Sequence, residues 1–224
     1  MTTPHEEYER LRGERPDLFA NPPGAWTAIL DDFPTEGGPY GVRYRDDYIL
    51  LLRDPVRFPD GRTGGYMRAL HAHGEGGAAV LATCEGGVVL LRHFRHATRQ
   101  WHWEIPRGYP EPGETPEQTA NRELREETGV PARSMTFLGD FYADTGAAGS
   151  KVGLFWAEVD RPHASHSEEG IDRVELVPPE RIDLMLGRGE ITDSFTLAAL
   201  LHAGVRGLAP FSSRPVRRAA AETG

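Results

Sequence analysis

The segment from Gly108 to Val130 constrains the fold of this chain more than any other, because it marks both ends of a helix. A helix-starting proline and a capping box mark its beginning: Thr115, Pro116 and Gln118. Gly129 can adopt the left-handed conformation that ends a helix, and Pro131 prevents continuation. The sequence therefore predicts a helix over residues 116–128.

The same segment contains six glutamates, three of them within its last eight residues. At ~100° per residue, Glu123, Glu126 and Glu127 fall within one arc of ~100° on the predicted helix. We expect no lysine or arginine among them to neutralise this arc. Hard cations such as Mg²⁺ and Mn²⁺ prefer carboxylate oxygens and would offset the repulsion. The spacing leaves two interpretations open, a divalent metal site and a solvated acidic face.

The composition excludes several classes of function. The formal net charge of −9 disfavours a general electrostatic grip on a nucleic acid polymer or an anionic membrane. Cys84 is the single cysteine, so no intrachain disulfide can form, and a reducing cytoplasm fits the chain. No apolar run approaches the ~18 residues that a membrane span needs, and the first residues lack the apolar core of a secretory signal.

Short apolar segments alternate with helical ones along the chain. Two apolar runs flank Glu85-Gly86-Gly87 and predict a β-hairpin with a tight glycine turn. Further strands are predicted at 47–58, 64–73, 101–106, 134–143, 151–160 and 170–178, and further helices at 178–189 and 193–205. This mixture indicates an α/β or α+β domain with a mixed sheet.

Three regions are expected. Residues 1–45 read as an N-terminal extension, with a polar helix over 6–19 followed by a Pro/Gly-rich connection. Residues 46–205 form the main domain. Residues 206–224 lack apolar periodicity and are predicted to be a flexible C-terminal tail.

The glutamate segment resembles the Nudix box. That pattern is Gly, five residues, Glu, seven residues, then Arg-Glu-apolar-any-Glu-Glu-any-Gly-apolar. Gly108, Glu114 and residues 122–130 match its nine specified positions without a gap. The resemblance implies a Nudix-type α/β/α sandwich with a mixed β-sheet, plus an N-terminal helix and strand extension. It also implies hydrolysis of a nucleoside diphosphate linked to another moiety.

Carried over to this chain, the resemblance implies a metal site that binds Mg²⁺, with Mn²⁺ as a substitute. Its ligands would be Glu123, Glu126, Glu127 and the backbone carbonyl of Arg107. The general base that activates water would be Glu126, Glu127 or Glu169, a choice that the sequence leaves open.

Three other residues of the box are implied to have a supporting role. Arg122 and Glu114 look like the pair that orients the preceding loop, which begins at Gly108, against the helix.

Beyond the box, roughly residues 45–205 resemble the ADP-ribose pyrophosphatase-like branch, whose members are commonly homodimers. The matching segments are VVLLRHFRHA, WEIPRG, SEEGIDRVELV and GEITDSFTLAAL. The resemblance implies that Arg95 holds a substrate phosphate, with a strand-end surface arginine as the alternative. Glu169 falls where the branch places a loop acid that acts as base or metal ligand, with a solvated loop acid as the alternative.

Two positions depart from the pattern of ADP-ribose hydrolases. Thr145-Gly146 stands where these enzymes typically carry a proline before a glycine. Arg107 stands where a small residue is common, and we expect its side chain to face outward, with contact to an extra phosphate or acidic group as the alternative.

These observations predict a Mg²⁺-dependent Nudix hydrolase that cleaves ADP-ribose or a nucleoside-diphosphate sugar to a nucleoside monophosphate and a sugar phosphate. One alternative is a Nudix hydrolase of dinucleotides or nucleoside triphosphates, and another is a non-catalytic nucleotide-sensing domain. The expected partners are a small-molecule substrate and a second copy of the chain in a cytoplasmic homodimer, without nucleic acid polymer or membrane.

Overall fold

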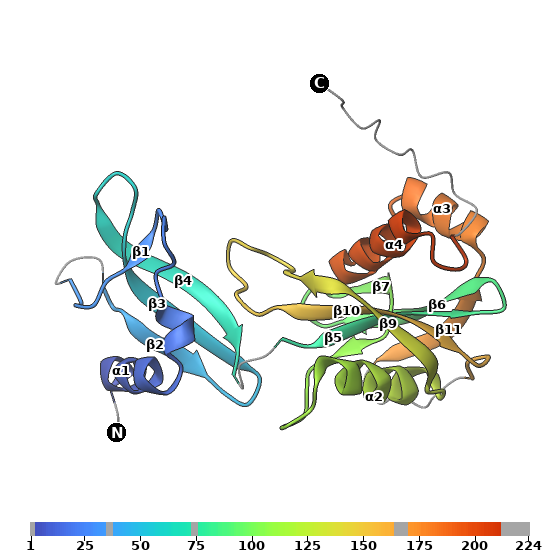
Figure 1. Cartoon of the computed structure of the whole chain (residues 1–224), viewed down its shortest axis with the longest axis horizontal. Helices are drawn as coiled ribbons and strands as arrows, with labels where there is room; N and C mark the ends of the chain where they lie inside the picture. Colours follow the sequence, from blue (N-terminus) through green and yellow to red (C-terminus); the bar gives the residue numbers. More distant parts are fainter. Residues whose placement is uncertain (1–2, 35–37, 73–75, 164–169, 212–224) are drawn as a thin grey trace. The chain divides into compact units, whose positions relative to one another are not determined.

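The computed structural model describes residues 3–34, 38–72, 76–163 and 170–211 (Figure 1). The chain divides into two compact units. The first comprises Met1–Glu75 and Asp144–Ser150, and the second comprises Gly76–Ala143 and Lys151–Gly224. The sequence placed the end of the N-terminal extension at residue 45. The structure differs, because the two strands that follow residue 45 pair within the first unit.

The N-terminal helix is shorter than predicted. α1 (Pro4–Glu14) ends before Arg15, and a separate 3-10 turn, η1 (Pro16–Phe19), follows it. The expected continuous helix over 6–19 is wrong, because Pro16 has no N–H to donate and disfavours a helical conformation in the residue before it.

A small antiparallel sheet completes the first unit. Its strands are β1 (Ala28–Ile29), β2 (Gly41–Arg45), β3 (Ile49–Arg57) and β4 (Thr63–His71), and β3 pairs with each of the other three. Tyr8 and Leu11 of α1 are buried with Leu50 and Leu52 of β3, which forms the core of this unit. The helix therefore covers one face of the sheet.

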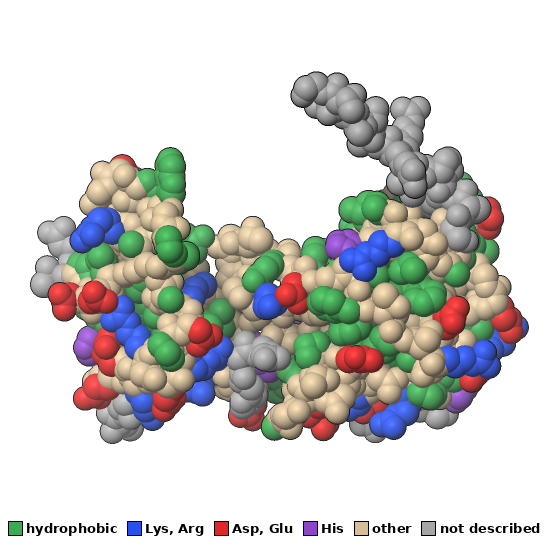
Figure 2. Space-filling model, in the orientation of Figure 1, with side chains coloured by type: hydrophobic (Ala, Val, Ile, Leu, Met, Phe, Trp, Pro, Cys, Tyr) green, Lys and Arg blue, Asp and Glu red, His purple; other side chains and the backbone are tan. Residues whose placement is uncertain are grey.

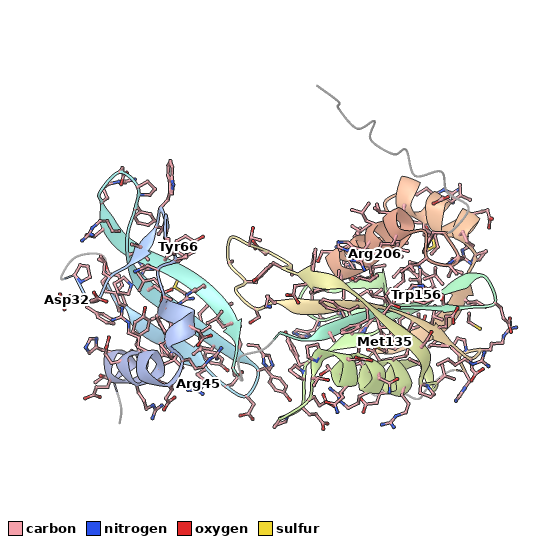
Figure 3. The ribbon with its side chains drawn as sticks, in the orientation of Figure 1. Asp32, Arg45, Tyr66, Met135, Trp156 and Arg206 are labelled. Atoms are coloured by element: carbon pink, nitrogen blue, oxygen red, sulfur yellow. The ribbon has the colours of Figure 1, made fainter. Side chains whose placement is uncertain are left out.

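The segment Asp144–Ser150 belongs to this first unit, although it connects two strands of the second. The N–H of Ala69 on β4 donates to the Ala147 carbonyl at 2.8 Å, and the Tyr66 hydroxyl donates to the Gly146 carbonyl at 2.7 Å. Tyr66 is labelled on its strand in Figure 3. The departure from the family pattern at Thr145-Gly146 therefore lies in a segment that is hydrogen-bonded to β4.

The second unit contains a seven-stranded mixed sheet. Its strands are β5 (Ala78–Cys84), β6 (Gly87–Arg95), β7 (Gln100–Glu104), β8 (Arg107–Gly108), β9 (Ala132–Phe141), β10 (Val152–Val159) and β11 (Ile171–Val177). The order is β11-β6-β5-β10-β9, with β7 paired to β6 and β8 paired to β5. The β5–β10 pair is parallel and the others are antiparallel. The predicted hairpin is present, with Glu85 and Gly86 both at positive φ in its two-residue turn.

Helices cover both faces of this sheet (Figure 1). α2 (Pro116–Thr128) contributes Ala120 and Leu124 to the apolar core on one face. α3 (Pro179–Gly187) and α4 (Ser194–Arg206) contribute Ile182 and Leu200 to the core on the other face. The predicted α/β/α sandwich with a mixed sheet is confirmed.

The sheet splits between its two central strands. β5 and β6 pair only next to the hairpin turn, at Thr83–Val88 and Cys84–Gly87. Farther along, β6 pairs with β7 and β5 pairs with β8. The chain crosses this split from β7 to β8 through Ile105 and Pro106.

The start of the predicted flexible tail is ordered. Arg206 ends α4 and donates to the carbonyl of Phe137 on β9 at 3.0 Å. Phe211 is buried in the core, and the indole N–H of Trp156 donates to the Ala209 carbonyl at 2.8 Å. Figure 3 labels Arg206 and Trp156. The expectation is therefore wrong for 206–211, while residues 212–224 lie outside the described part.

Among the described residues, none of the helices combines the length and the apolar character of a membrane span. Figure 2 shows acidic and basic side chains interspersed over the visible face.

Leu124→Ala tests the α2 core. Leu124 is fully buried, so its truncation should lower the free energy of unfolding by about 2–5 kcal/mol. Leu184→Ala on α3 is the control, because Leu184 is 57% exposed and its loss should cost less than about 0.5 kcal/mol. Urea unfolding followed by far-UV circular dichroism measures both, and equal losses would contradict this placement of α2.

Candidate active site

The helix that carries the acidic residues begins and ends as predicted. Thr115 accepts a hydrogen bond from the Gln118 N–H at 3.3 Å, and Gln118 accepts one from the Thr115 N–H at 2.9 Å. Gly129 ends α2 in the left-handed conformation, at φ 79°. These local bonds fix the first and last turns, and they determine which residues face the sheet.

The three predicted metal ligands share one side of α2 but differ in exposure. Glu123 and Glu127 are 8% and 2% exposed, whereas the Glu126 side chain is 49% exposed. Both buried carboxylates lie against β8. The Arg107 N–H donates to Glu127 Oε2 at 3.1 Å, and a Cβ on Gly108 would overlap the Glu123 carboxylate. Glycine at this position of the box therefore leaves the space that the Glu123 carboxylate occupies.

Arg122 lies among the acids. Its Nη1 donates to Glu123 Oε1 at 2.8 Å and to Glu126 Oε2 at 3.0 Å. The expectation that no basic residue would join this arc is wrong. Arg122 precedes Glu126 by four residues, the spacing at which helical side chains meet, so the sequence did contain this signal.

Arg122 also binds the loop that precedes the helix. Its Nε and Nη2 donate to the two oxygens of Glu114 at 2.9 and 3.1 Å, and Nη2 donates to the Tyr109 carbonyl at 2.7 Å. Glu114 also accepts from the Glu111 N–H and the Thr119 hydroxyl. Hydrogen bonds from Arg122 are the main reason that the pKa of Glu114 falls to about 2.

A second charged cluster lies in the split of the sheet. Glu104, at the end of β7, is 2% exposed and accepts from Arg95 Nε at 2.7 Å. Arg107 Nη2 lies 3.4 Å from Glu104 Oε2 and 3.5 Å from Asp193 Oδ1. The Arg107 guanidinium also lies over the Phe195 ring, 4.7 Å from its centroid. The expected outward orientation of Arg107 is wrong, because its side chain extends between buried acids.

Sequence reasoning missed two acidic residues of this cluster, Glu104 and Asp193. Glu104 is the one acid within the otherwise apolar and aromatic segment WHWEIP, which was a signal for a buried partner. Asp193 caps α4 by accepting from the N–H and hydroxyl of Thr196, at 2.9 and 2.7 Å. Glu169 lies outside the described residues, so its role stays a prediction.

The described ranges hold no group of three His, Cys, Asp or Glu side chains arranged to bind a metal ion. Arg122 accounts for part of this, because it binds Glu123 and Glu126 directly. The donor chemistry fits a hard divalent cation, since the carboxylates of Glu114, Glu123 and Glu126 share the one guanidinium of Arg122. Glu127 adds a fourth, buried carboxylate, which accepts from the Arg107 N–H. A cation there would offset an excess of negative charge.

Comparison with known proteins decides the family. The NUDIX domain matches residues 74–196, more than half of the chain. The chain belongs to the Nudix family. The resemblance seen in its box is thereby confirmed, and the matched range covers α2, β8 and the cluster around Glu104.

Two relatives of known activity extend the Nudix match. An ADP-ribose pyrophosphatase of Bacillus subtilis is 34% identical over 157 residues, covering 68% of this chain and 83% of the relative. An ADP-ribose pyrophosphatase of Mycobacterium tuberculosis is 34% identical over 168 residues, covering 72% and 80%. The crystal structure of an ADP compounds hydrolase shares the fold, with a TM-score of 0.60 at 17% identity and coverage of 77% and 95%. The ADP-ribose pyrophosphatase-like branch is thus confirmed.

The stability of the site should depend on pH through Glu114. Its pKa is lowered on folding from 4.5 to about 2, so its contribution is fully present above pH ~4.5 and is lost as the pH falls towards 2. The difference in unfolding free energy between wild type and Glu114→Gln should therefore shrink as the pH falls from 7 to 3. When the same comparison is made between Arg122→Gln and the double variant with Glu114→Gln, the difference in unfolding free energy should depend less on pH. If it depends on pH as strongly as before, Arg122 is not the cause of the lowered pKa.

Proposed function

We propose that this chain cleaves the diphosphate of ADP-ribose or of a nucleoside-diphosphate sugar, with a divalent metal ion, to a nucleoside monophosphate and a sugar phosphate. As a member of the Nudix family, the chain is a pyrophosphohydrolase. The proposal concerns the identity of its substrate and its metal ion. The names of its relatives favour an ADP-ribose-type substrate.

The observation that carries the proposal is the pair of buried carboxylates against β8. Burying two acids is costly unless positive charge lies close to them. Glu123 and Glu127 are almost fully buried, and Arg122 supplies one charge that it shares with Glu114 and Glu126. The arrangement favours a cation at the Glu123–Glu127 side of α2.

Glu123, Glu126, Glu127 and the carbonyl of Arg107 are the groups that would hold this metal. When bound, a divalent ion neutralises the diphosphate and stabilises the charge that develops during cleavage. The proposal names Mg²⁺, with Mn²⁺ as a substitute.

The side chains supply the remaining chemistry. A carboxylate takes a proton from the water that attacks one phosphorus in line with the leaving oxygen, and Glu126, Glu127 and Glu169 are the candidates. Arg95 is the proposed phosphate-binding residue. Its Nε and Nη2 are held by Glu104, and among the described residues its Nη1 has no hydrogen-bond partner. That side of the guanidinium can donate to a phosphate oxygen.

Homodimer formation and a cytoplasmic location stay predictions from the sequence. Size-exclusion chromatography with light scattering measures the first directly.

A substrate panel tests the proposal. ADP-ribose, UDP-, GDP- and ADP-sugars, dinucleotides and nucleoside triphosphates are incubated with Mg²⁺ and with Mn²⁺, and products are identified by mass. We expect ADP-ribose or a nucleotide sugar to be cleaved, and Glu127→Gln to lower the rate about 100-fold or more. Glu117→Gln is the matched control, because Glu117 is an exposed acid on the same helix.

The panel also separates the alternatives. Cleavage of dinucleotides or triphosphates alone would replace the proposed substrate class. Tight nucleotide binding without cleavage above the Glu127→Gln background would favour the non-catalytic sensing domain.

Gly108→Ala tests the close approach of β8 to α2. The added methyl group displaces the Glu123 carboxylate, so kcat/KM should fall about 10- to 100-fold. Gly204→Ala, in α4, is the control because a methyl group there meets no atom within 4 Å. Wild-type activity in Gly108→Ala would show that the position of Glu123 does not matter to the reaction.

A further inference from the structure

Strand β8 is very short, although the two buried carboxylates of α2 lie against it. It has two residues, Arg107 and Gly108, and pairs with β5 at Ala78 and Ala79, next to a hydrogen bond from the Val80 N–H to the Pro106 carbonyl at 2.9 Å. Prolines at 106 and 110 flank it and donate no backbone hydrogen bonds. Both buried carboxylates of α2 nevertheless rest against this backbone. Few backbone hydrogen bonds therefore hold β8, so side-chain contacts can add to its anchoring.

The side chain of Arg107 supplies such an anchor. Arg107 is aligned with Ala79, whose side chain belongs to the core under α4, whereas Gly108 is aligned with Ala78, which belongs to the core under α2. The backbone of Arg107 thus contacts Glu127 of α2, while its guanidinium contacts Asp193 and Phe195 at the start of α4. One residue connects the two helical layers through the sheet.

The partners of this guanidinium are themselves fixed. Asp193 is 8% exposed and is held by its capping bonds to Thr196, and Glu104 is 2% exposed and is held by Arg95. The planar face of a guanidinium can stack on Phe195 while Nη2 contacts the two carboxylates, and a lysine ammonium has no such planar face. Glu104, Asp193 and Phe195 thus form a clamp around the Arg107 side chain, and the stacking on Phe195 favours arginine at this position.

The contacts of the Arg107 side chain are poorly arranged for stabilising the fold. Nη2 lies 3.4 and 3.5 Å from its two carboxylates, at the long end of hydrogen bonding. The buried Nε has no hydrogen-bond partner within the described ranges, and an unsatisfied buried donor destabilises the folded state. An arrangement that runs against local stability is typical of a functional site.

We propose that Arg107 is a positioning residue, whose side chain, clamped between Glu104, Asp193 and Phe195, fixes β8 so that its backbone holds Glu127 and Glu123 in place for a divalent cation. The role rests on the proposed metal-dependent function. It concerns the side chain of Arg107 and is separate from any ligation by its carbonyl.

Mn²⁺ binding without substrate tests this role. The free Mn²⁺ signal is titrated by electron paramagnetic resonance with wild type, Arg107→Met and Arg107→Lys, each shown by circular dichroism to be fully folded. Arg107→Met should weaken binding about 10-fold, the usual effect of losing a residue that orients metal ligands. Arg107→Lys should stay weakened, because it lacks the planar fork. Arg188→Met, at an exposed arginine following α3, is the control and should bind like wild type.

Hydrogen exchange supplies a second readout. Backbone amides of a peptide spanning β8 should exchange faster in Arg107→Met than in wild type, whereas peptides from α3 should not change. If Arg107→Met fails to fold, Phe195→Leu removes the stacked ring and should weaken Mn²⁺ binding in the same direction.

Several outcomes would overturn the proposal. Arg107→Met could bind Mn²⁺ with wild-type affinity, or Arg107→Lys could restore the wild-type affinity in full. Alternatively, Arg107→Met could raise KM for the substrate without weakening Mn²⁺ binding, which would make Arg107 a direct substrate contact. Absence of Mn²⁺ binding by wild type would also overturn it. If wild type binds Mn²⁺ but hydrolyses no substrate of the panel, the proposed function is wrong. The positioning role of Arg107 would still stand.

Discussion

The burial of two α2 carboxylates against a two-residue strand is the constraint on which the rest of the site depends. Glu123 fits because Gly108 has no side chain, and Glu127 is held by the N–H of Arg107. Both contacts depend on how other parts of the chain are arranged. The helix must start at a defined residue, and the preceding loop must return to it. The sheet must also open to admit β8.

Arg122 and Arg107 help to position the α2 acids in different ways. Arg122 ties α2 to the preceding loop through both oxygens of Glu114, and its charge lowers the repulsion between Glu123 and Glu126. Arg107 acts from the other side of the sheet, where Asp193 holds its guanidinium at the start of α4. The acids are thus positioned by local bonds on the helix and by contacts that reach across the sheet.

Features encoded by neighbouring residues could be predicted from the sequence. The bounds of α2 follow from a capping box and a C-terminal glycine, which act within a few residues. The glutamates share a face because helical geometry requires it. The pair of Arg122 and Glu126 was equally local and was overlooked. The break at Pro16 also had a local cause, which the polar character of residues 6–19 obscured.

Contacts between distant segments could not be read in this way. Arg107 and Asp193 are 86 residues apart, and no spacing rule relates them. Only the split of the sheet brings Glu104 between Arg95 and Arg107, because it depends on which strands pair beyond the hairpin turn. The sequence by itself determined the helix, its acidic face and the Nudix family, since these depend on short-range geometry and fixed spacing. The tertiary structure decided which acids are buried and which arginines hold them, because burial and long-range ion pairs arise only when the layers pack together.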